Sequence, residues 1–457
     1  MTDDTPKKKN EARSTRPASE EFKAFIADHW AEPSDVATTL IAAAPYAAER
    51  RERLSARFPG DRIVAPAGDL KPRANDTDYR FRPHSDFAYL TGLGADFEPG
   101  AVLVMEPAAD GGHDSTLYLI PPAGREDEGF YADPRSGEFW IGRRPGLAEF
   151  TAMTGLATAP LAELPKGLRL HNHPLKAVQR ALSEMRMVKD VYEIQQLRDA
   201  VNATIAGFER VVRELPRAIE HKRGERVVEA SFDGHAREEG NAVGYETIAA
   251  SGPHATTLHW IRNDGQVRRG DLLLLDAGVE VESLYTADIT RVLPIDGEFT
   301  AVQQRVYDVV LEAADAGFAV AKPGAKFIDV HNAAMAVIEK RLNEWGIVPP
   351  AEDDDARLYR RWMVHSTSHH LGLDVHDCAA AKRELYMEGE LLPGMVFTIE
   401  PGLYFKPDDL AVPAELRGIG VRIEDDVLVT EDGCENLSAA LPREADAVIA
   451  WMARLRG

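Results

Sequence analysis

Residues 272–278 read Leu-Leu-Leu-Leu-Asp-Ala-Gly, and residues 287–291 read Ala-Asp-Ile-Thr-Arg. Each stretch has the apolar character of a short buried β-strand. Each also carries a carboxylate where water should be scarce, Asp276 in the first stretch and Asp288 in the second. A single carboxylate at the end of a strand is usually a turn residue, so neither stretch alone indicates a function.

Two more acids interrupt apolar strands later in the chain. Glu400 follows Met-Val-Phe-Thr-Ile at residues 395–399, and Glu424 follows Val-Arg-Ile at residues 421–423. If the four acids converge, burying them unpaired costs several kcal/mol each unless they take up protons. Arg422 lies on the same strand face as Glu424, but one guanidinium cannot neutralise four carboxylates. The pattern therefore predicts bound cations.

Two divalent metal ions would supply about four positive charges, and a water shared between such ions becomes a hydroxide nucleophile near neutral pH. Ligands that are mostly oxygen, with one or two imidazoles, favour Mn²⁺, Co²⁺ or Fe²⁺ over structural zinc. The residues thus indicate a dinuclear hydrolytic site.

Histidines supply the remaining candidate groups. Residues 365–377 contain His365, His369, His370 and His376. Four histidines within twelve residues of a glycine-containing segment are uncommon where histidines serve only for packing. Any one histidine is nevertheless more often structural than catalytic. His259, taken by itself, is typical of a partly buried packing residue.

The surrounding periodicity predicts helices alternating with strands. Asp190 and Glu193 form a capping-box pattern ahead of apolar residues repeated at three- and four-residue steps up to Leu215. Short hairpin-like links between elements favour an α+β fold with an antiparallel sheet over a Rossmann or barrel fold. We predict further helices at 225–239, 301–321 and 327–345, and strands at 245–250, 271–280, 284–294, 395–400 and 420–430.

The length of 457 residues predicts two domains with a tail. Residues 1–34 are polar and are expected to be disordered or extended, residues 35–185 form an N-terminal α/β domain, and residues 186–457 form the catalytic domain. The formal net charge of −22 argues against a nucleic-acid partner. No run of 18 apolar residues predicts a membrane span. Two cysteines and a polar N-terminus without an apolar signal core indicate a reducing, cytoplasmic location.

The acidic and histidine segments closely resemble those of the pita-bread metallopeptidases, and the fuller pattern is similar to aminopeptidase P. The resemblance covers roughly residues 35–450. The segments that carry it are 276–278, 287–291, 368–377, 398–404 and 417–425 in the second half, and 79–92 and 139–146 in the first.

The resemblance implies a metal-ligand set and residue roles. Asp276, Asp288 and Glu424 would bind one metal, and Asp288, His369, Glu400 and Glu424 the other. His369 is chosen over His370 because it follows Ser368. Glu400 would also carry a proton from the bridging hydroxide to the leaving proline nitrogen. His259 and His376 would orient substrate and stabilise the oxyanion, Arg422 would support the carboxylates, and His365 would line the substrate site.

The implied protein is an α+β chain in which a smaller N-terminal α/β domain precedes a C-terminal pita-bread domain. Its implied activity is that of a metal-dependent exopeptidase, which hydrolyses the bond between an N-terminal residue and a penultimate proline by means of a hydroxide bridging two divalent metals. Peptides with proline at position two are the implied partners, Mn²⁺ is the favoured metal, and a homodimer or homotetramer is expected.

Four alternatives share the fold. A prolidase would use the same ligands but accept only Xaa-Pro dipeptides. Methionine aminopeptidase normally lacks an N-terminal domain of this kind. A pita-bread domain that binds peptides or proteins without catalysis, or a creatinase-type metal-free hydrolase, would be expected to lose ligands, whereas this chain retains all five.

Overall fold

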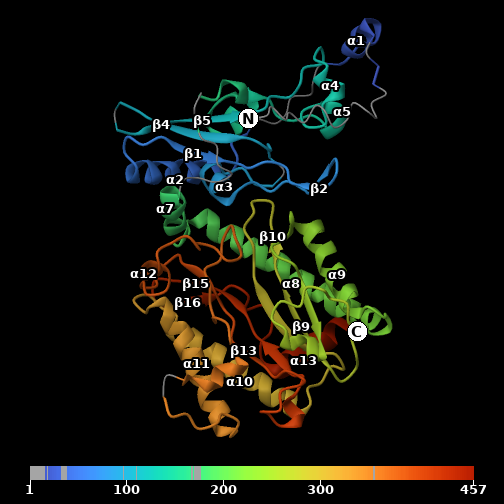
Figure 1. Ribbon diagram of the computed structural model, residues 1–457, viewed down its shortest axis with the longest axis vertical. Coiled ribbons are helices and arrows are strands. Elements are labelled where there is room, and N and C mark those ends of the chain that lie inside the picture. The colour runs from blue at the N-terminus through green and yellow to red at the C-terminus, as the bar shows by residue number, and fades with distance from the viewer. Residues whose placement is uncertain are drawn as a thin grey trace. The chain divides into compact units, whose positions relative to one another are not determined.

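The computed structural model describes residues 16–17, 19–31, 39–95, 97–109, 111–165, 168, 176–353 and 356–456. The chain divides into two compact units, Met1–Gln179 and Arg180–Gly457 (Figure 1). The domain bounds at 34/35 and 185/186 remain predictions. None of the helices in the described ranges combines the length and apolar character needed to cross a bilayer.

The N-terminal unit is built on a four-stranded sheet in the order β1-β4-β5-β6. The first three strands pair antiparallel, and β6 lies parallel to β5. Its elements are α1 Glu20–Ala27, α2 Ala44–Arg57, β1 Ile63–Pro66, β2 Pro72–Ala74, β3 Thr77–Asp78, α3 Ser85–Thr91, β4 Val102–Pro107, β5 His113–Leu119, α4 Gly129–Ala132, α5 Glu138–Ile141, α6 Leu147–Thr154, β6 Ala157–Pro160 and η3 Leu161–Glu163, with α7 Lys176–Arg186 across the division.

Within the predicted tail, residues Glu20–Ala27 instead form helix α1. Ser19 caps the helix by accepting a hydrogen bond from the backbone N–H of Phe22. The Phe22 ring meets Tyr131 edge to face at 5.3 Å, so aromatic contacts stabilise a segment whose composition is polar. Residues 1–15, 18 and 32–34 of the predicted tail lie outside the described residues.

Four long helices of the C-terminal unit fall close to their predicted positions. Asp190 and Glu193 exchange the two hydrogen bonds of a capping box, each 3.0 Å long. Thr300 caps its helix in the same way with Gln303. The four helices are α8 Val191–Glu220, α9 Gly224–Glu239, α10 Ala301–Val320 and α11 Phe327–Glu344.

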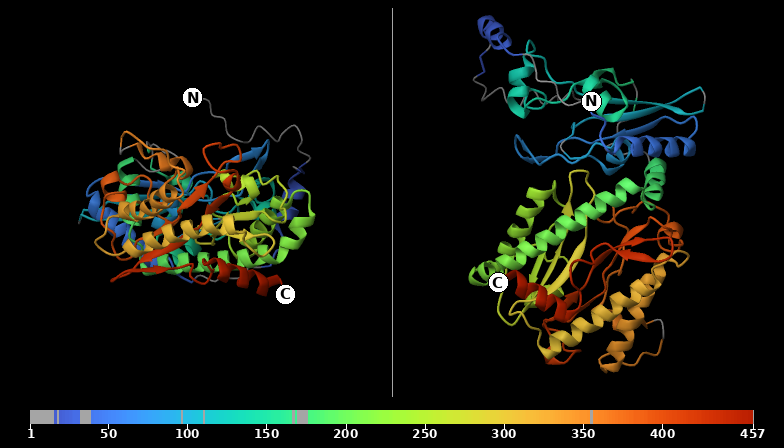
Figure 2. Two further views of the ribbon diagram at one scale, coloured as in Figure 1. Left: turned by 90° about the horizontal axis from the view of Figure 1, so that it is seen from below. Right: turned by 180° about the vertical axis from the view of Figure 1, so that it is seen from behind.

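These helices lie on one face of the strands. Helix α8 packs along α9, and α10 packs along α11 (Figure 1). Seen from behind, the green α8, the gold α10 and the red α13 (Ala445–Arg456) lie in front of the strands of this unit (Figure 2). Two clusters of buried apolar side chains lie between the helices and the strands, so the strand ends are rigidly supported.

The strands are shorter than predicted, and their breaks have local causes. The predicted strand 271–280 divides at Gly278, where a Cβ would stand 1.8 Å from the Ala287 carbonyl oxygen. The predicted strand 284–294 begins only at Ile289, because Leu284 has a φ of 73° and lies in a turn. The elements are β7 Ala242–Val243, β8 Ile248–Ser251, η4 Gly252–Thr256, β9 Leu272–Ala277, β10 Val279–Glu280, β11 Ile289–Pro294, η6 Leu358–Trp362, α12 Arg383–Tyr386, β12 Val396–Ile399, β13 Gly402–Tyr404, η7 Ala414–Leu416, β14 Gly420–Arg422, β15 Asp425–Val429, β16 Cys434–Asn436 and α13 Ala445–Arg456.

The predicted strand 420–430 also divides, because it changes partners. Strand β14 pairs with β13, whereas β15 pairs with β12. Between them, Glu424 forms an isolated bridge with Thr290 of β11. The same segment therefore connects three groups of strands at one point, and that point is where the acids meet.

Candidate metal centre

The sequence-predicted site residues line one cavity of about 640 Å³ in the C-terminal unit. The cavity also has apolar walls, including Ile248, Leu258 and Val375. A mixed polar and apolar cavity of this size is typical of a small-molecule or peptide site. The predicted residues brought together there are Asp276, Asp288, His369, Glu400, Glu424, His259, His365, His376 and Arg422.

Strand register explains why the acids converge. Strands β9 and β11 pair antiparallel with Asp276 opposite Thr290. Asp288, two residues before Thr290, therefore lies diagonally across from Asp276 on the same face. Thr290 in turn bridges to Glu424 and donates a 2.7 Å hydrogen bond to its carboxylate. Backbone pairing in or next to these strands thus fixes the positions of three acids.

Buried Arg422 holds this network from one side. Its guanidinium forms an ion pair with Asp276 and donates to Thr290 Oγ1 at 3.1 Å and to the Tyr404 hydroxyl at 3.1 Å. Tyr404 also lies 2.8 Å from His365 Nε2. Arg422 therefore fixes one acid and, through Tyr404, links the acids to a histidine.

His369 presents one nitrogen to the acids. Its Nδ1 lies 3.2 Å from the carbonyl oxygen of His370, which sets that nitrogen as the donor. Its Nε2 then points at the carboxylates, 3.2 Å from Asp288 Oδ2, 3.7 Å from Glu400 Oε1 and 4.0 Å from Glu424 Oε1. An imidazole held through its outer nitrogen is the usual arrangement of a metal-binding histidine.

The pKa shifts of these groups indicate that the cavity favours positive charge. Burial raises the pKa of Glu400 to about 8, and burial with the charge of Asp288 raises the pKa of Glu424 well above its ordinary value. Burial lowers the pKa of His369, but the hydrogen bond to Asp288 and the charge of Glu400 outweigh burial and raise it to about 9. The site therefore binds protons where a cation could bind instead.

The donor set fits divalent metal ions. Ligand atoms of Asp288, His369 and Glu424 lie within 4.8 Å of one another. Glu400 and Asp276 line the same cavity. The basic groups of the site that lie close to the four carboxylates are the Arg422 guanidinium and the His369 and His365 imidazoles. Oxygen ligands with one imidazole suit Mn²⁺, Co²⁺ or Fe²⁺.

The other histidines lie around this centre. The His376 ring meets the His369 ring edge to face at 4.5 Å, and His365 Nδ1 lies 3.6 Å from Glu400 Oε2. His259 is exposed to the cavity from the loop after η4. His370, which we did not assign to metal, is fully buried and stacks on Phe327 at 4.6 Å.

Ionic contacts also anchor the segment that carries His376. Arg186 Nε lies 3.0 Å from Asp377 Oδ1, and Lys189 Nζ lies 3.8 Å from Asp377 Oδ2. The backbone N–H of Asp377 donates to the His370 carbonyl at 2.9 Å, the same oxygen that orients His369. The His370 carbonyl group therefore couples the position of His369 to that of the segment that carries His376.

Sequence reasoning missed Tyr245. Its hydroxyl hydrogen-bonds to both Asp276, at 2.6 Å, and Asp288. Burial and the charge of Asp276 raise the pKa of Tyr245 well above its ordinary value, so the hydroxyl stays a donor. A lone tyrosine before a short strand carries no pattern that could have predicted this contact.

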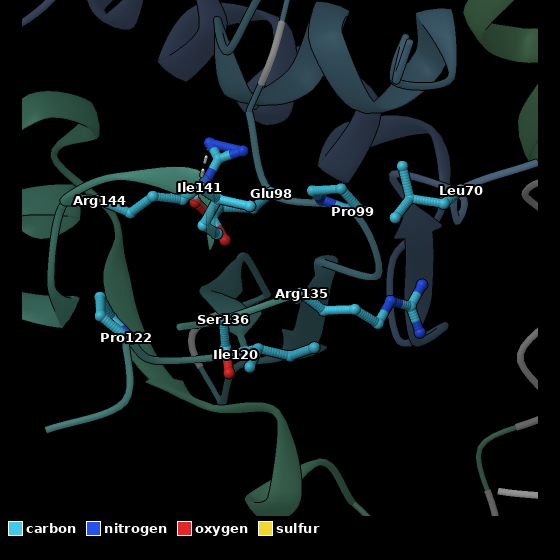
Figure 3. A pocket seen from close by; sticks show the side chains of 9 residues that line it. All are labelled: Leu70, Glu98, Pro99, Ile120, Pro122, Arg135, Ser136, Ile141 and Arg144. Carbon is cyan, nitrogen blue, oxygen red and sulfur yellow. Dashed lines mark ion pairs between the residues drawn. The ribbon is translucent and has the colours of Figure 1, made fainter. Parts of the chain in front are cut away.

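A second pocket lies within the N-terminal unit (Figure 3). Its volume of about 20 Å³ leaves room for about one water molecule. Glu98 and Arg144 form an ion pair of 3.6 Å across it, and Arg135 pairs with Asp69. The volume excludes a peptide, so this pocket is not a substrate site.

Comparison with known proteins now places the chain. Residues 195–431 match the family described as "Metallopeptidase family M24", and residues 47–175 match "Aminopeptidase P, N-terminal domain". The chain belongs to the M24 metallopeptidases. This M24 member is 49% identical to Xaa-Pro aminopeptidase 1 of Streptomyces coelicolor over 96% of this chain and 93% of that protein.

More distant relatives agree with this assignment. Xaa-Pro aminopeptidase of Escherichia coli is 31% identical over 89% of this M24 chain and 97% of its own length. The structure of Escherichia coli aminopeptidase P with the inhibitor Pro-Leu matches with a TM-score of 0.78 at 29% identity, covering 92% of this chain and 100% of that one. Pseudomonas aeruginosa aminopeptidase PepP matches with a TM-score of 0.76.

These findings confirm the predicted family and fold class, a smaller α/β N-terminal domain followed by a pita-bread domain. Membership of a metallopeptidase family also implies that this M24 chain binds a divalent metal and acts on peptides. The ligand set, the residue roles and the identity of the metal remain predictions.

Proposed function

We propose that this M24 chain is an Xaa-Pro aminopeptidase, which removes the N-terminal residue from peptides whose second residue is proline. The observation that supports this most is the convergence of the four acids and His369 in one cavity of a chain 49% identical to a Streptomyces Xaa-Pro aminopeptidase. A cavity rich in acids suits the free ammonium group of a peptide N-terminus. That charge preference accounts for an exopeptidase rather than an endopeptidase.

Two divalent ions would be held by Asp276, Asp288, His369, Glu400 and Glu424, with Asp288 and Glu424 shared between them. Oxygen-rich ligation favours Mn²⁺, with Co²⁺ or Fe²⁺ as alternatives. When bound, such ions would lower the pKa of a water molecule, so that it can lose a proton and act as a nucleophile near neutral pH.

The side chains around the metals would carry the rest of the reaction. Glu400 takes a proton from the attacking water and delivers it to the proline nitrogen as the amide C–N bond breaks and the new C–O bond forms. His376 and His259 donate hydrogen bonds to the developing oxyanion. His365, which lies 2.8 Å from the Tyr404 hydroxyl, would contact the substrate, and Arg422 keeps Asp276 in place.

Location and assembly extend the same proposal. Cys378 and Cys434 are both free, which suits a reducing cytoplasm. We propose a homodimer or homotetramer. Sedimentation analysis of the purified chain at several concentrations tests the assembly, and a concentration-independent monomer would contradict it.

A comparison of peptide lengths tests the activity. Purified protein loaded with Mn²⁺ should release the first residue from Xaa-Pro tripeptides and longer Xaa-Pro peptides, and should leave matched Xaa-Ala peptides intact. Activity confined to Xaa-Pro dipeptides would favour the prolidase alternative. A chain that binds metal and Xaa-Pro peptides but cleaves none of them would favour a non-catalytic binding module.

A further inference from the structure

Glu225 is a completely buried carboxylate outside the metal centre, in the first turn of α9. It lines no part of the substrate cavity. A buried carboxylate is tolerated only where donors surround it. Its position in the first helical turn is electrostatically favourable, but the helix supplies only part of what the charge needs.

Four donors from one later segment satisfy this carboxylate. Oε1 accepts from the backbone N–H of Ser251 at 2.9 Å and lies 2.7 Å from His254 Nδ1. Oε2 accepts from Trp260 Nε1 at 2.9 Å and from the backbone N–H of Gly265 at 2.6 Å. The donors are therefore distributed along the whole segment of residues 251–265, including its first and last residues.

The backbone closes the same arrangement. The N–H of Glu225 donates to the Gly265 carbonyl at 3.2 Å, so the two residues exchange hydrogen bonds. A Cβ on Gly265 would stand 2.6 Å from His254 Cε1 and 2.7 Å from Glu225 Oε2. The His254 ring stacks on Trp260 at 3.8 Å. These contacts leave the segment little freedom.

Residues 251–265 form one wall of the substrate cavity. Leu258, His259 and Ile261 all line it. His259 is exposed, and among the described residues no hydrogen bond holds its ring. Its neighbour Trp260 is buried and bonded to Glu225. The location of His259 is therefore set by the anchoring of its neighbours.

We infer that Glu225 is a positioning residue of the aminopeptidase, which holds residues 251–265 so that His259 and the adjacent wall meet the substrate. The inference rests on the proposed function. Glu225 touches neither metal ligands nor substrate, so it acts through the segment that it binds. The Glu225 carboxylate is well suited to this role because it accepts four hydrogen bonds and donates none.

The variant Glu225→Gln replaces two acceptor sites with an amide that donates, and two of the four donors then face another donor. In the full chain loaded with Mn²⁺, kcat/KM for an Xaa-Pro tripeptide should fall by about 10- to 100-fold, because misplaced positioning groups cost that much. Hydrogen exchange should rise over residues 251–265 only, and Mn²⁺ content should stay at the wild-type level. Glu239→Gln, the same change at an exposed position of α9, should alter none of these readouts.

Unchanged exchange over residues 251–265, or increased exchange with unchanged kcat and KM, would overturn the inference. Increased hydrogen exchange throughout the C-terminal unit, together with loss of Mn²⁺, would show a merely structural role and would also overturn the inference. Should Glu225→Gln fail to fold, Trp260→Phe removes one donor and should give smaller changes of the same direction, and a silent Trp260→Phe would count against the inference. If the wild-type chain cleaves no Xaa-Pro peptide, the proposed function fails, while the exchange readout still reports on the Glu225 contacts.

Discussion

Asp288 lies at the centre of the candidate ligand set. Its Oδ2 is 3.2 Å from His369 Nε2, and its other oxygen accepts from Tyr245. We predict that Asp288→Ala abolishes metal binding and activity together, with a loss of kcat/KM greater than the ~100-fold typical of outer contacts. Metal analysis after gel filtration and initial-rate assays measure the two effects.

An exposed aspartate provides the matched control for this change. Asp408→Ala removes a carboxylate from the same unit without touching the cavity and should leave both readouts at the wild-type level. An Asp288→Ala variant that kept either metal content or activity would contradict the shared-ligand role.

His376 tests a different role. Its ring lies 4.5 Å from that of His369, but its side chain is exposed to the cavity. We predict that His376→Ala retains metal and lowers kcat by about 10²- to 10³-fold, because a preorganised oxyanion donor is lost. Loss of metal from this variant would instead mark His376 as a ligand.

The acids could be predicted from the sequence because each one interrupts an apolar strand, and a buried charge is unfavourable unless a partner or a bound cation compensates it. Tyr245 and Glu225 could not. The hydroxyl of Tyr245 reaches acids 31 and 43 residues away, and Glu225 accepts donors 26 to 40 residues away. Such contacts exist only once helices and strands have packed, so no local pattern records them.

At the scale of elements, Asp409 fixes η6 to the loop after β13. It accepts two hydrogen bonds from Arg361, at 2.8 and 3.0 Å, and one from Trp362 at 3.0 Å. The hydrogen bond from Arg361 is the main reason that the pKa of Asp409 falls from 3.8 to about 2. A depressed pKa means that the ionised carboxylate stabilises the folded state.

We predict that Asp409→Asn lowers the free energy of unfolding by about 1 kcal/mol at pH 7, a modest value because Arg361 is largely exposed and water screens its charge. The contribution is complete above pH 3.8 and is lost as pH falls through about 2. Urea unfolding of both proteins between pH 7 and pH 2 should therefore show the difference shrinking only below about pH 4. A difference that stays constant down to pH 2 would exclude this ion pair as its source.

Helices were more predictable than strands. Capping residues such as Asp190 and Thr300 act within one turn, so the sequence alone places the helix starts. Strand limits depend on partners. The predicted strand 420–430 divides because Ile423 donates to Pro401 and Glu424 donates to Thr290, two residues that lie far away in the sequence. The same division is what turns Glu424 toward the other acids.

For the whole molecule, the division into two units determines which part of the chain bound metal should stabilise. Every candidate ligand lies in Arg180–Gly457, and their strands belong to its two apolar cores. A ligand that binds only the folded state stabilises it by about 2.7 kcal/mol at a free concentration of 100 times its Kd. Removal of metal also leaves Asp288, Glu400 and Glu424 to repel one another, so the lost stability should be concentrated around these strands.

We predict that chelation of the Mn²⁺-loaded chain increases hydrogen exchange in β9, β11 and β12 and leaves β1, β4 and β5 of the N-terminal unit unchanged. Restoring Mn²⁺ should reverse the change together with activity. In Asp288→Ala, chelation should alter neither region, because little metal is bound at the start. An equal response of both units would mean that the effect of metal is not confined to the unit that holds the acids, and it would contradict the view that the cations chiefly offset the local repulsion of these carboxylates.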